Sequence, residues 1–299
     1  MLRSRRLVVA LSQHLGYLRL KPRDYSSVGL FASYDGNILG GLLLGAGMAL
    51  AGSCPGMVFV QVGTGIPSGF YTLAGTILGG VAWSGILGPA ITARTKKTPI
   101  ENPDTKPAKL AIYEHLGISR SSAAVGVAVS FAVIVALISL FIPPQTQGLV
   151  TPITGGLLIA GAQLVSIIAR SKLLGTSTSF EEVGGFIWRL IRGRGSNTPK
   201  PSSYGATVLT GGMVVGAFLV PLITPFVTRS PVPPPLIWDL IQPARAVLGG
   251  VLLAIGSRMG GGCTSGHGIS GISLLSVSSF ISVAAMFGGG MAVATLFGL

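Results

Sequence analysis

Two cysteines occupy matching positions in two similar segments, and the chain contains no other cysteine. One apolar segment opens at Gly40 and leads to Cys54, and the other opens at Gly249 and leads to Cys263. In both segments the cysteine follows the opening glycine by 14 residues. A thiol is a weak, polarizable hydrogen-bond donor, which suits a sulfur-containing ligand. The spacing predicts one site built from two thiols.

The backbone around both cysteines is predicted to be irregular. Pro55 follows Cys54 and cannot easily continue a helix, while Cys263 lies in the glycine-rich stretch GGGCTSGHG. Such breaks free backbone N–H groups, which attract anions together with helix N-termini. Small hydroxyls beside Cys263 would add donors. The candidate substrate-binding residues are Cys54, Pro55, Gly56, Arg258, Gly262, Cys263, Thr264, Ser265 and His267.

Few other side chains in apolar segments could do chemistry. Arg258 lies inside an apolar run, where a charge is usually paired or functional. It could face an anionic substrate or bond the carbonyl end of a neighbouring helix. Glu181 and Glu182 are expected in a solvated loop, and Asp35 and Asn37 are expected to cap the first clear helix.

The two cysteines could also have roles other than binding a sulfur-containing ligand. They could pack as small apolar residues, or they could join His267 as metal ligands. A structural zinc site typically needs four ligands, and the chain has only three histidines. Nothing else resembles a hydrolase built on a Cys/His pair. The sequence therefore predicts no catalytic residue, no metal and no cofactor.

The elements that must position these residues are predicted to be membrane helices. Mean hydropathy is +0.70, and 10% of residues are charged, against about 25% in soluble domains. Helices of about 20 apolar residues are expected at 37–53, 66–91, 121–142, 150–169, 205–227, 245–262 and 272–298, with 7–20 as an uncertain eighth. Internal Gly and Pro predict broken or re-entrant helices. The fold class is an all-α integral membrane protein with about seven to nine transmembrane helices.

The basic residues predict the orientation. The net charge is +13, and all but three of the 21 Lys and Arg residues lie before residue 24, in 92–120 or in 170–200. The positive-inside rule places the N-terminus and these loops inside, and places 143–149 and 228–239 outside. Basic loops at a membrane explain the charge without a nucleic-acid partner. The two cysteine segments would then run in opposite directions, as in a pseudo-twofold inverted repeat with a midplane site.

We expect a basic N-terminal segment over 1–30 and a single transport domain over 31–299, with repeat halves at about 34–142 and 150–299. The basic segment could be an organelle presequence, the inner flank of the first span or a shortened first helix. Both a mitochondrial inner membrane and a plasma membrane fit this topology.

The two cysteine frames, the segment GGGCTSGHGISG at 260–271 and the segment GTSTSFEE at 175–182 resemble the YeeE/YedE sulfur-transport family. The resemblance implies helical inverted halves and uptake of thiosulfate or a related sulfur anion, which passes between cysteines. By position, that role falls on Cys54 and Cys263. Bacterial members can have a further pathway cysteine, which this chain lacks. Members also usually show a full helix before the first frame.

The expected function is a permease for thiosulfate or a related anion, embedded in a lipid bilayer. The family also suggests a soluble sulfurtransferase as a partner. Two alternatives stay open: a sulfur carrier that holds a persulfide, and a general inorganic-anion channel whose cysteines only pack. No G-x-x-x-x-G-K-[ST] segment is present, so no nucleotide site of that type indicates the driving force.

Overall fold

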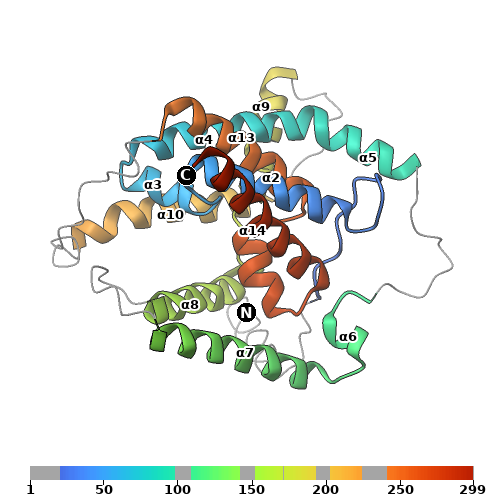
Figure 1. Ribbon diagram of the computed structural model, residues 1–299. Coiled ribbons are helices and arrows are strands. Elements are labelled where there is room, and N and C mark those ends of the chain that lie inside the picture. The colour runs from blue at the N-terminus through green and yellow to red at the C-terminus, as the bar shows by residue number, and fades with distance from the viewer. Residues whose placement is uncertain are drawn as a thin grey trace, which may run out of the picture.

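The computed structural model describes residues 21–97, 109–141, 152–170, 172–192, 203–223 and 241–298. These residues form helices and contain no strand, apart from an isolated bridge between Ala111 and Ser276. The all-α class predicted from the sequence is confirmed (Figure 1). The helices are α2 (Asp35–Ala51), α3 (Met57–Gly63), α4 (Pro67–Ala82), η1 (Trp83–Leu87), α5 (Gly88–Lys97), α6 (Ile112–Leu116), α7 (Arg120–Phe141), α8 (Pro152–Arg170), α9 (Thr178–Arg192), α10 (Gly205–Ile223), α13 (Pro243–Met259), η2 (Thr264–Gly271) and α14 (Val277–Phe297).

Six of the seven predicted apolar runs each overlap one of these helices, and the run at 66–91 covers α4, η1 and the start of α5. The 7–20 run lies outside the described residues. Four helical stretches are long and apolar enough to cross a membrane: Pro67–Thr95, Arg120–Phe141, Gly205–Ile223 and Val277–Phe297. The pair α13 and η2, bent by 44°, would make a fifth span. Shorter apolar helices lie at Asp35–Ala51 and Ile153–Ile168. The count of seven to nine spans therefore stays a prediction.

Four helices make the centre of the molecule, in the order α4, α13, α2 and α14 (Figure 1). Near the start of α2, Gly40 packs against Gly256 and Gly260, and near its end Gly47 packs against Gly249 and Leu253. Because the numbers rise along α2 as they fall along α13, these two helices are antiparallel. The segments that lead to the two cysteines thus run in opposite directions.

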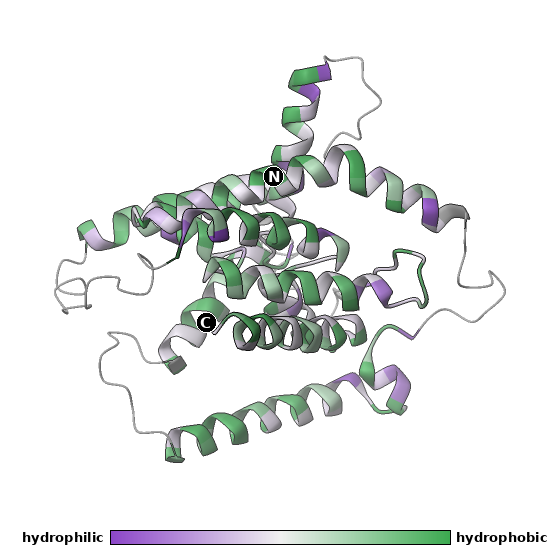
Figure 2. Cartoon of the chain, turned by 45° about the horizontal axis from the view of Figure 1, so that its top comes forward, coloured by the Kyte–Doolittle hydropathy of each residue, from purple (hydrophilic) through white to green (hydrophobic). Residues whose placement is uncertain are grey.

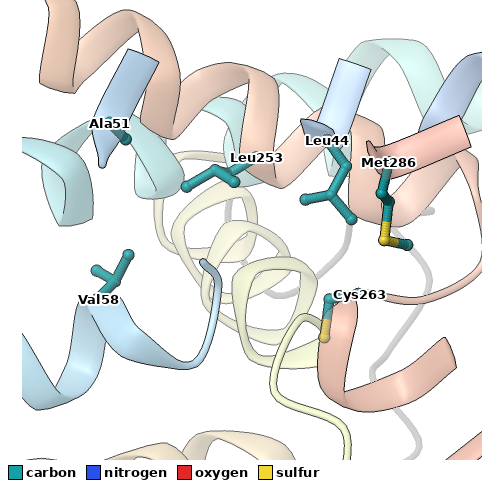
Figure 3. Close-up of a cluster of buried hydrophobic side chains, with 6 residues drawn as sticks. All are labelled: Leu44, Ala51, Val58, Leu253, Cys263 and Met286. Carbon is teal, nitrogen blue, oxygen red and sulfur yellow. The ribbon is translucent and has the colours of Figure 1, made fainter. Parts of the chain in front are cut away.

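Glycines allow the central backbones to approach closely. A Cβ on Gly47 would lie 2.7 Å from the Leu253 nitrogen, and one on Gly79 would lie 2.8 Å from the Val251 carbonyl oxygen. Small residues at helix interfaces permit close contacts of this kind in membranes, where packing must replace the hydrophobic effect. Larger side chains fill what remains, and Leu44 and Leu253 are fully buried in the same cluster as Cys263 (Figure 3).

The peripheral helices are apolar and exposed. Ala123 is the one buried residue of α7, and hydrophobic residues run along that helix on all sides (Figure 2). A helix that is hydrophobic all round belongs in a membrane or a core. We therefore assign the exposed surface of α7 to lipid.

The segment before α2 is attached by the two residues that were expected to cap that helix. The Asp35 carboxylate accepts hydrogen bonds from the backbone N–H groups of Val28 and Leu30, and Asn37 Oδ1 accepts one from Ser26 N at 2.7 Å. Helix α2 has Tyr34 at its N-cap position and no side-chain cap. The capping prediction was therefore wrong. Both side chains are fully buried, where an unpaired polar group would be costly, and they hold residues 26–31 against the helix.

Candidate functional site

Cys54 lies in the turn between α2 and α3. Gly52 closes α2 in the left-handed conformation (φ 58°), which glycine adopts without steric strain. Pro55 is fully buried, so the turn is packed into the protein. The Cys54 thiol is partly exposed, and its sulfur accepts a hydrogen bond from Met57 N at 3.4 Å. The predicted helix break after the first frame is confirmed.

Cys263 lies in the equivalent break between α13 and η2. Gly261, the counterpart of Gly52 in the second frame, also has a positive φ of 77°. The Cys263 side chain is fully buried, and its sulfur lies 3.2 Å from Ser265 Oγ. Both cysteines are free thiols. The two frames therefore share the glycine-mediated helix end as well as the spacing.

Thr176 connects the two cysteine loops. Its Oγ1 lies 3.5 Å from Cys263 Sγ and 3.5 Å from Ser265 Oγ. The same oxygen lies 3.8 Å from the position that a Cβ on Gly56 would take, two residues after Cys54. No role was predicted for Thr176 from the sequence, although this residue lies in the GTSTSFEE segment that supported the resemblance. The structure thus places a third loop between the two predicted ones.

The extended segment around Thr176 is fixed by side chains on two neighbours. Ser270 of η2 donates a hydrogen bond to the Leu174 carbonyl at 2.7 Å, and Gln163 of α8 accepts one from Leu174 N at 3.0 Å. Ser179 Oγ donates to the Thr176 carbonyl at 2.6 Å. Backbone polar groups away from water must be satisfied in this way when they are not helical. Thr176 is consequently held by bonds that do not involve its own hydroxyl.

His267 holds the second loop closed. Its imidazole is buried, with Nε2 3.0 Å from the Gly260 carbonyl oxygen and Nδ1 3.0 Å from Ser279 Oγ. Since a carbonyl only accepts, Nε2 carries the proton and Nδ1 accepts from Ser279 in the neutral ring. Both ring nitrogens are engaged by the protein. The geometry therefore gives His267 a direct role in positioning η2.

Arg258 lies near the end of α13, the helix that leads into the Cys263 loop. Its guanidinium is ion-paired with Glu181 of α9, and both residues line a cavity of about 760 Å³ with Ser26, Trp83 and Thr92. Neither cysteine lines that cavity. Arg258 is therefore not directed at the thiols in this conformation, and its contact with substrate stays a prediction.

The two adjacent acids do not lie in a solvated loop. Both belong to α9, where Glu181 pairs with Arg258. Glu182 is buried and accepts hydrogen bonds from Ala206 N, from Thr207 N and from Thr207 Oγ1. A carboxylate at a helix N-terminus satisfies N–H groups that have no partner within the helix. Glu182 thus anchors the start of α10, and the expectation of a loop was wrong.

Five of the nine predicted site residues lie in the two breaks between helices: Cys54, Pro55 and Gly56 on one side, and Gly262 and Cys263 on the other. Thr264, Ser265 and His267 lie in η2, which follows directly, and Arg258 lies in α13. Within the described part of the chain, no group of three His, Cys, Asp or Glu side chains is arranged to hold a metal ion. The arrangement offers thiols, hydroxyls and freed backbone N–H groups, which can bind a small oxyanion without covalent chemistry.

Residues 4–292 match the family described as Sulphur transport. A probable transporter of Xylella fastidiosa strain Temecula1 is 33% identical over 150 residues, which are 50% of this chain and 94% of the relative. A second probable transporter, from strain 9a5c, is 31% identical over the same shares. A thiosulfate transporter, TsuA of Spirochaeta thermophila, is 25% identical over 294 residues, which cover 92% of this chain and 79% of that protein.

Proposed function

The chain belongs to the Sulphur transport family, and on that premise we propose that it is a membrane permease for thiosulfate or a related small sulfur anion. Membership of a transport family confirms that the chain is a transporter and not an enzyme. The similarity to a thiosulfate transporter supports the choice of substrate. The four apolar helical stretches support an integral membrane location.

The convergence of the Cys54 and Cys263 loops at Thr176 carries the proposal for the pathway. Thr176 Oγ1 is 3.5 Å from Cys263 Sγ and lies beside Gly56 of the other loop. An anion that enters a membrane must exchange water for protein donors. Here the donors are the two thiols, the hydroxyls of Thr176 and Ser265, and the N–H groups freed at the two helix ends. The anion passes between Cys54 and Cys263 with no covalent step.

The packing of the central helices supports the inverted repeat. Gly40 and Gly249 are equivalent positions in the two frames, as are Gly47 and Gly256. Gly40 packs on Gly256, and Gly249 packs on Gly47, so each contact is the counterpart of the other. Gly41 of α2 packs on Ser282 and Met286 of α14, and its counterpart Gly250 of α13 packs on Thr72 and Thr76 of α4. A twofold relation of this kind brings two broken helices to one site near the midplane.

The same proposal includes the surroundings of the protein. The basic loops and the N-terminus lie inside, because positively charged loops are retained there. The membrane is a plasma membrane or a mitochondrial inner membrane. A soluble sulfurtransferase on the inner side would consume the anion and so maintain inward flux. The seven predicted spans are completed by the shorter apolar helices α2 and α8.

Uptake of radiolabelled thiosulfate into proteoliposomes tests the function. Wild type is compared with Cys54→Ala and Cys263→Ala, each checked for folding by size exclusion and thermal unfolding. We expect saturable uptake by wild type and a loss of at least about tenfold in each variant, since each removes a donor that replaces water. Sulfate and chloride serve as competing anions.

Three outcomes would contradict parts of the proposal. Full uptake by both cysteine variants would leave a permease without a thiol pathway. Equal flux of chloride and thiosulfate would indicate a general anion channel. A mass increase of about 32 Da, one sulfur atom on a thiol, after exposure to thiosulfate would indicate a persulfide carrier.

A further inference from the structure

Arg23 reaches the Cys263 loop from outside both cysteine frames. It belongs to the segment before α2, which the sequence placed in a basic N-terminal stretch. Its Nη1 donates a hydrogen bond of 2.7 Å to the Gly261 carbonyl. A Cβ on Gly262 would lie 2.7 Å from Nη1, and one on Gly266 would lie 3.1 Å from Nη2. The guanidinium therefore lies directly on the loop that carries Cys263.

The glycines of that loop make room for the guanidinium. Gly262 and Gly266 flank Cys263 and Ser265, and a side chain at either glycine would collide with Arg23. Gly175, next to Thr176, lies at 3.9 Å from Nη2 by the same measure. Arg23 thus borders the Cys263 loop and the Thr176 segment, two of the three loops that form the proposed pathway.

The backbone of Arg23 is fixed on both sides. Its carbonyl accepts hydrogen bonds from Ser276 Oγ at 2.9 Å and from Ser278 Oγ at 3.2 Å. Three residues later, Ser26 Oγ donates to the Met259 carbonyl at 2.7 Å. These bonds tie the segment to α13 and α14, so the side chain is presented at a defined place and not as part of a mobile tail.

Arg23 has no acidic partner in the part of the chain that the structure describes. Within the described residues, the ion pairs are Lys21 with Asp24 and Arg258 with Glu181, and Arg23 is in neither. Burial is the main reason that the pKa of Arg23 lies below its usual value; an ionised Cys263 would raise that pKa, and Arg258 lowers it. Arg23, Cys263 and Arg258 are therefore close enough to interact electrostatically. Since Arg258 is paired with Glu181, Arg23 is the cation at the Cys263 loop that has no acidic partner among the residues that the structure describes.

We propose that Arg23 is an anion-recognition residue of the pathway, which attracts and selects a doubly charged sulfur oxyanion at the Cys263 loop. This inference rests on the proposed function, because it assigns the anion to that same site. A guanidinium presents donors in a planar fork that suits an oxyanion. One N–H of Arg23 is used by Gly261, and the others can turn to an anion at Cys263.

The first test measures the electric field at Cys263 without measuring transport. In a Cys54→Ala background, Cys263 is the only thiol, and it is modified with an anionic and a cationic methanethiosulfonate, for which the pathway must open because the side chain is fully buried. The ratio of the two rates cancels the thiolate fraction and reports the local charge. We expect the anionic reagent to react faster, and we expect Arg23→Gln to lower the ratio about tenfold, as for a charge removed at close range and low dielectric.

Matched variants separate charge from structure. Lys21→Gln removes the same charge two residues away, from an exposed side chain paired with Asp24, and should leave the ratio unchanged. Arg23→Lys keeps the charge and should also preserve it. A role limited to bonding Gly261 would lower thermal stability in Arg23→Gln and leave the ratio as it was. A parent ratio of one or less would overturn the proposal even if Arg23→Gln does not fold.

The second test uses thiosulfate uptake by the full chain with both cysteines. Arg23→Gln should raise KM about tenfold with a smaller effect on the maximal rate, and Arg23→Lys should recover part of the loss. An unchanged KM in folded Arg23→Gln would overturn the role. If wild type takes up no thiosulfate, the proposed function fails, while the reagent ratio still decides whether Arg23 sets the charge at Cys263.

Discussion

The two thiols have different surroundings although their frames match. Cys263 is fully buried beside two hydroxyls, whereas Cys54 is partly exposed and its sulfur receives a backbone N–H. Equivalent positions in a repeat need not be chemically equivalent, because the loops that face them differ. Thr176 and Arg23 both lie at Cys263, so this half of the site holds most of the polar contacts. Selection of the anion is therefore expected mainly at Cys263.

A substitution at Thr176 tests whether its hydroxyl serves the pathway. Thr176→Val has nearly the same shape and removes the oxygen that contacts Cys263 and Ser265. We expect thiosulfate uptake to fall about tenfold, because a lost hydrogen bond at a dry site leaves its partners unpaired. The segment itself should keep its place, since the bonds that hold it use backbone atoms.

Thr176→Ser is the matched control, because it retains the hydroxyl and loses only a methyl group. Uptake close to wild type in Thr176→Ser, together with a loss in Thr176→Val, would assign the effect to the oxygen. Equal uptake by the two variants, both folded, would leave Thr176 as a packing residue between the loops.

Residues that follow a local rule could be predicted from the sequence. Pro55 after Cys54 indicated the break in the first frame, and the three glycines before Cys263 indicated the break in the second. Thr176, Arg23 and Glu182 follow no such rule, since their partners lie 87, 238 and 24 residues away, respectively. Contacts over such separations depend on tertiary packing. From its charge alone, Arg23 was predicted to lie in a basic N-terminal segment and Glu182 in a solvated loop.

Among the elements, α2 and α13 were predicted closely because hydropathy and paired glycines specify a close-packed membrane helix. The apolar runs identified where helices occur, and the sign of the loop charges suggested their directions. Helix breaks were harder to locate. The run at 66–91 contains α4, the π-helical turn η1 and the start of α5. Its internal Gly and Pro predicted an interruption, but they did not indicate that it would be a π-helical turn.

The contact between α2 and α13 should be sensitive to a single methyl group. Gly47→Ala would place a Cβ 2.7 Å from Leu253 N and 2.8 Å from the Gly249 carbonyl oxygen. We expect a loss of about 1–3 kcal/mol, typical of overpacking, seen as a lower thermal unfolding temperature in detergent. The Cys54 and Cys263 loops directly follow the ends of α2 and α13, so a shift of these helices should also lower thiosulfate uptake.

Gly288→Ala in α14 is the control, because nothing lies within 4 Å of the added Cβ. It should be neutral or stabilise by up to about 1 kcal/mol, since alanine favours the helix over glycine. Equal unfolding temperatures for the two alanine variants would contradict a tightly packed interface between α2 and α13.

At the scale of the whole molecule, the structure separates a close-packed centre from exposed apolar helices. The centre holds both cysteine loops, and the segment before α2 closes over one of them. α7 is the clearest lipid-facing element, with 22 residues and a mean hydropathy of 2.7 over an 18-residue window. At 1.5 Å per residue it is about 33 Å long, which matches a hydrocarbon core of about 30 Å.

Whether α7 crosses the membrane, and in which direction, can be measured. In a Cys54→Ala, Cys263→Ala background, single cysteines are introduced by Ser119→Cys, before α7, and by Gln147→Cys, after it. A membrane-impermeant maleimide should label them from opposite faces, with Ser119→Cys on the inner side, where Arg120 and the basic loop are retained. Ser203→Cys, after the other basic loop, should label from the same side as Ser119→Cys. If Ser119→Cys and Gln147→Cys label from one face, α7 does not cross the membrane. Every element after it would then change direction, and the positive-inside assignment would fail with it.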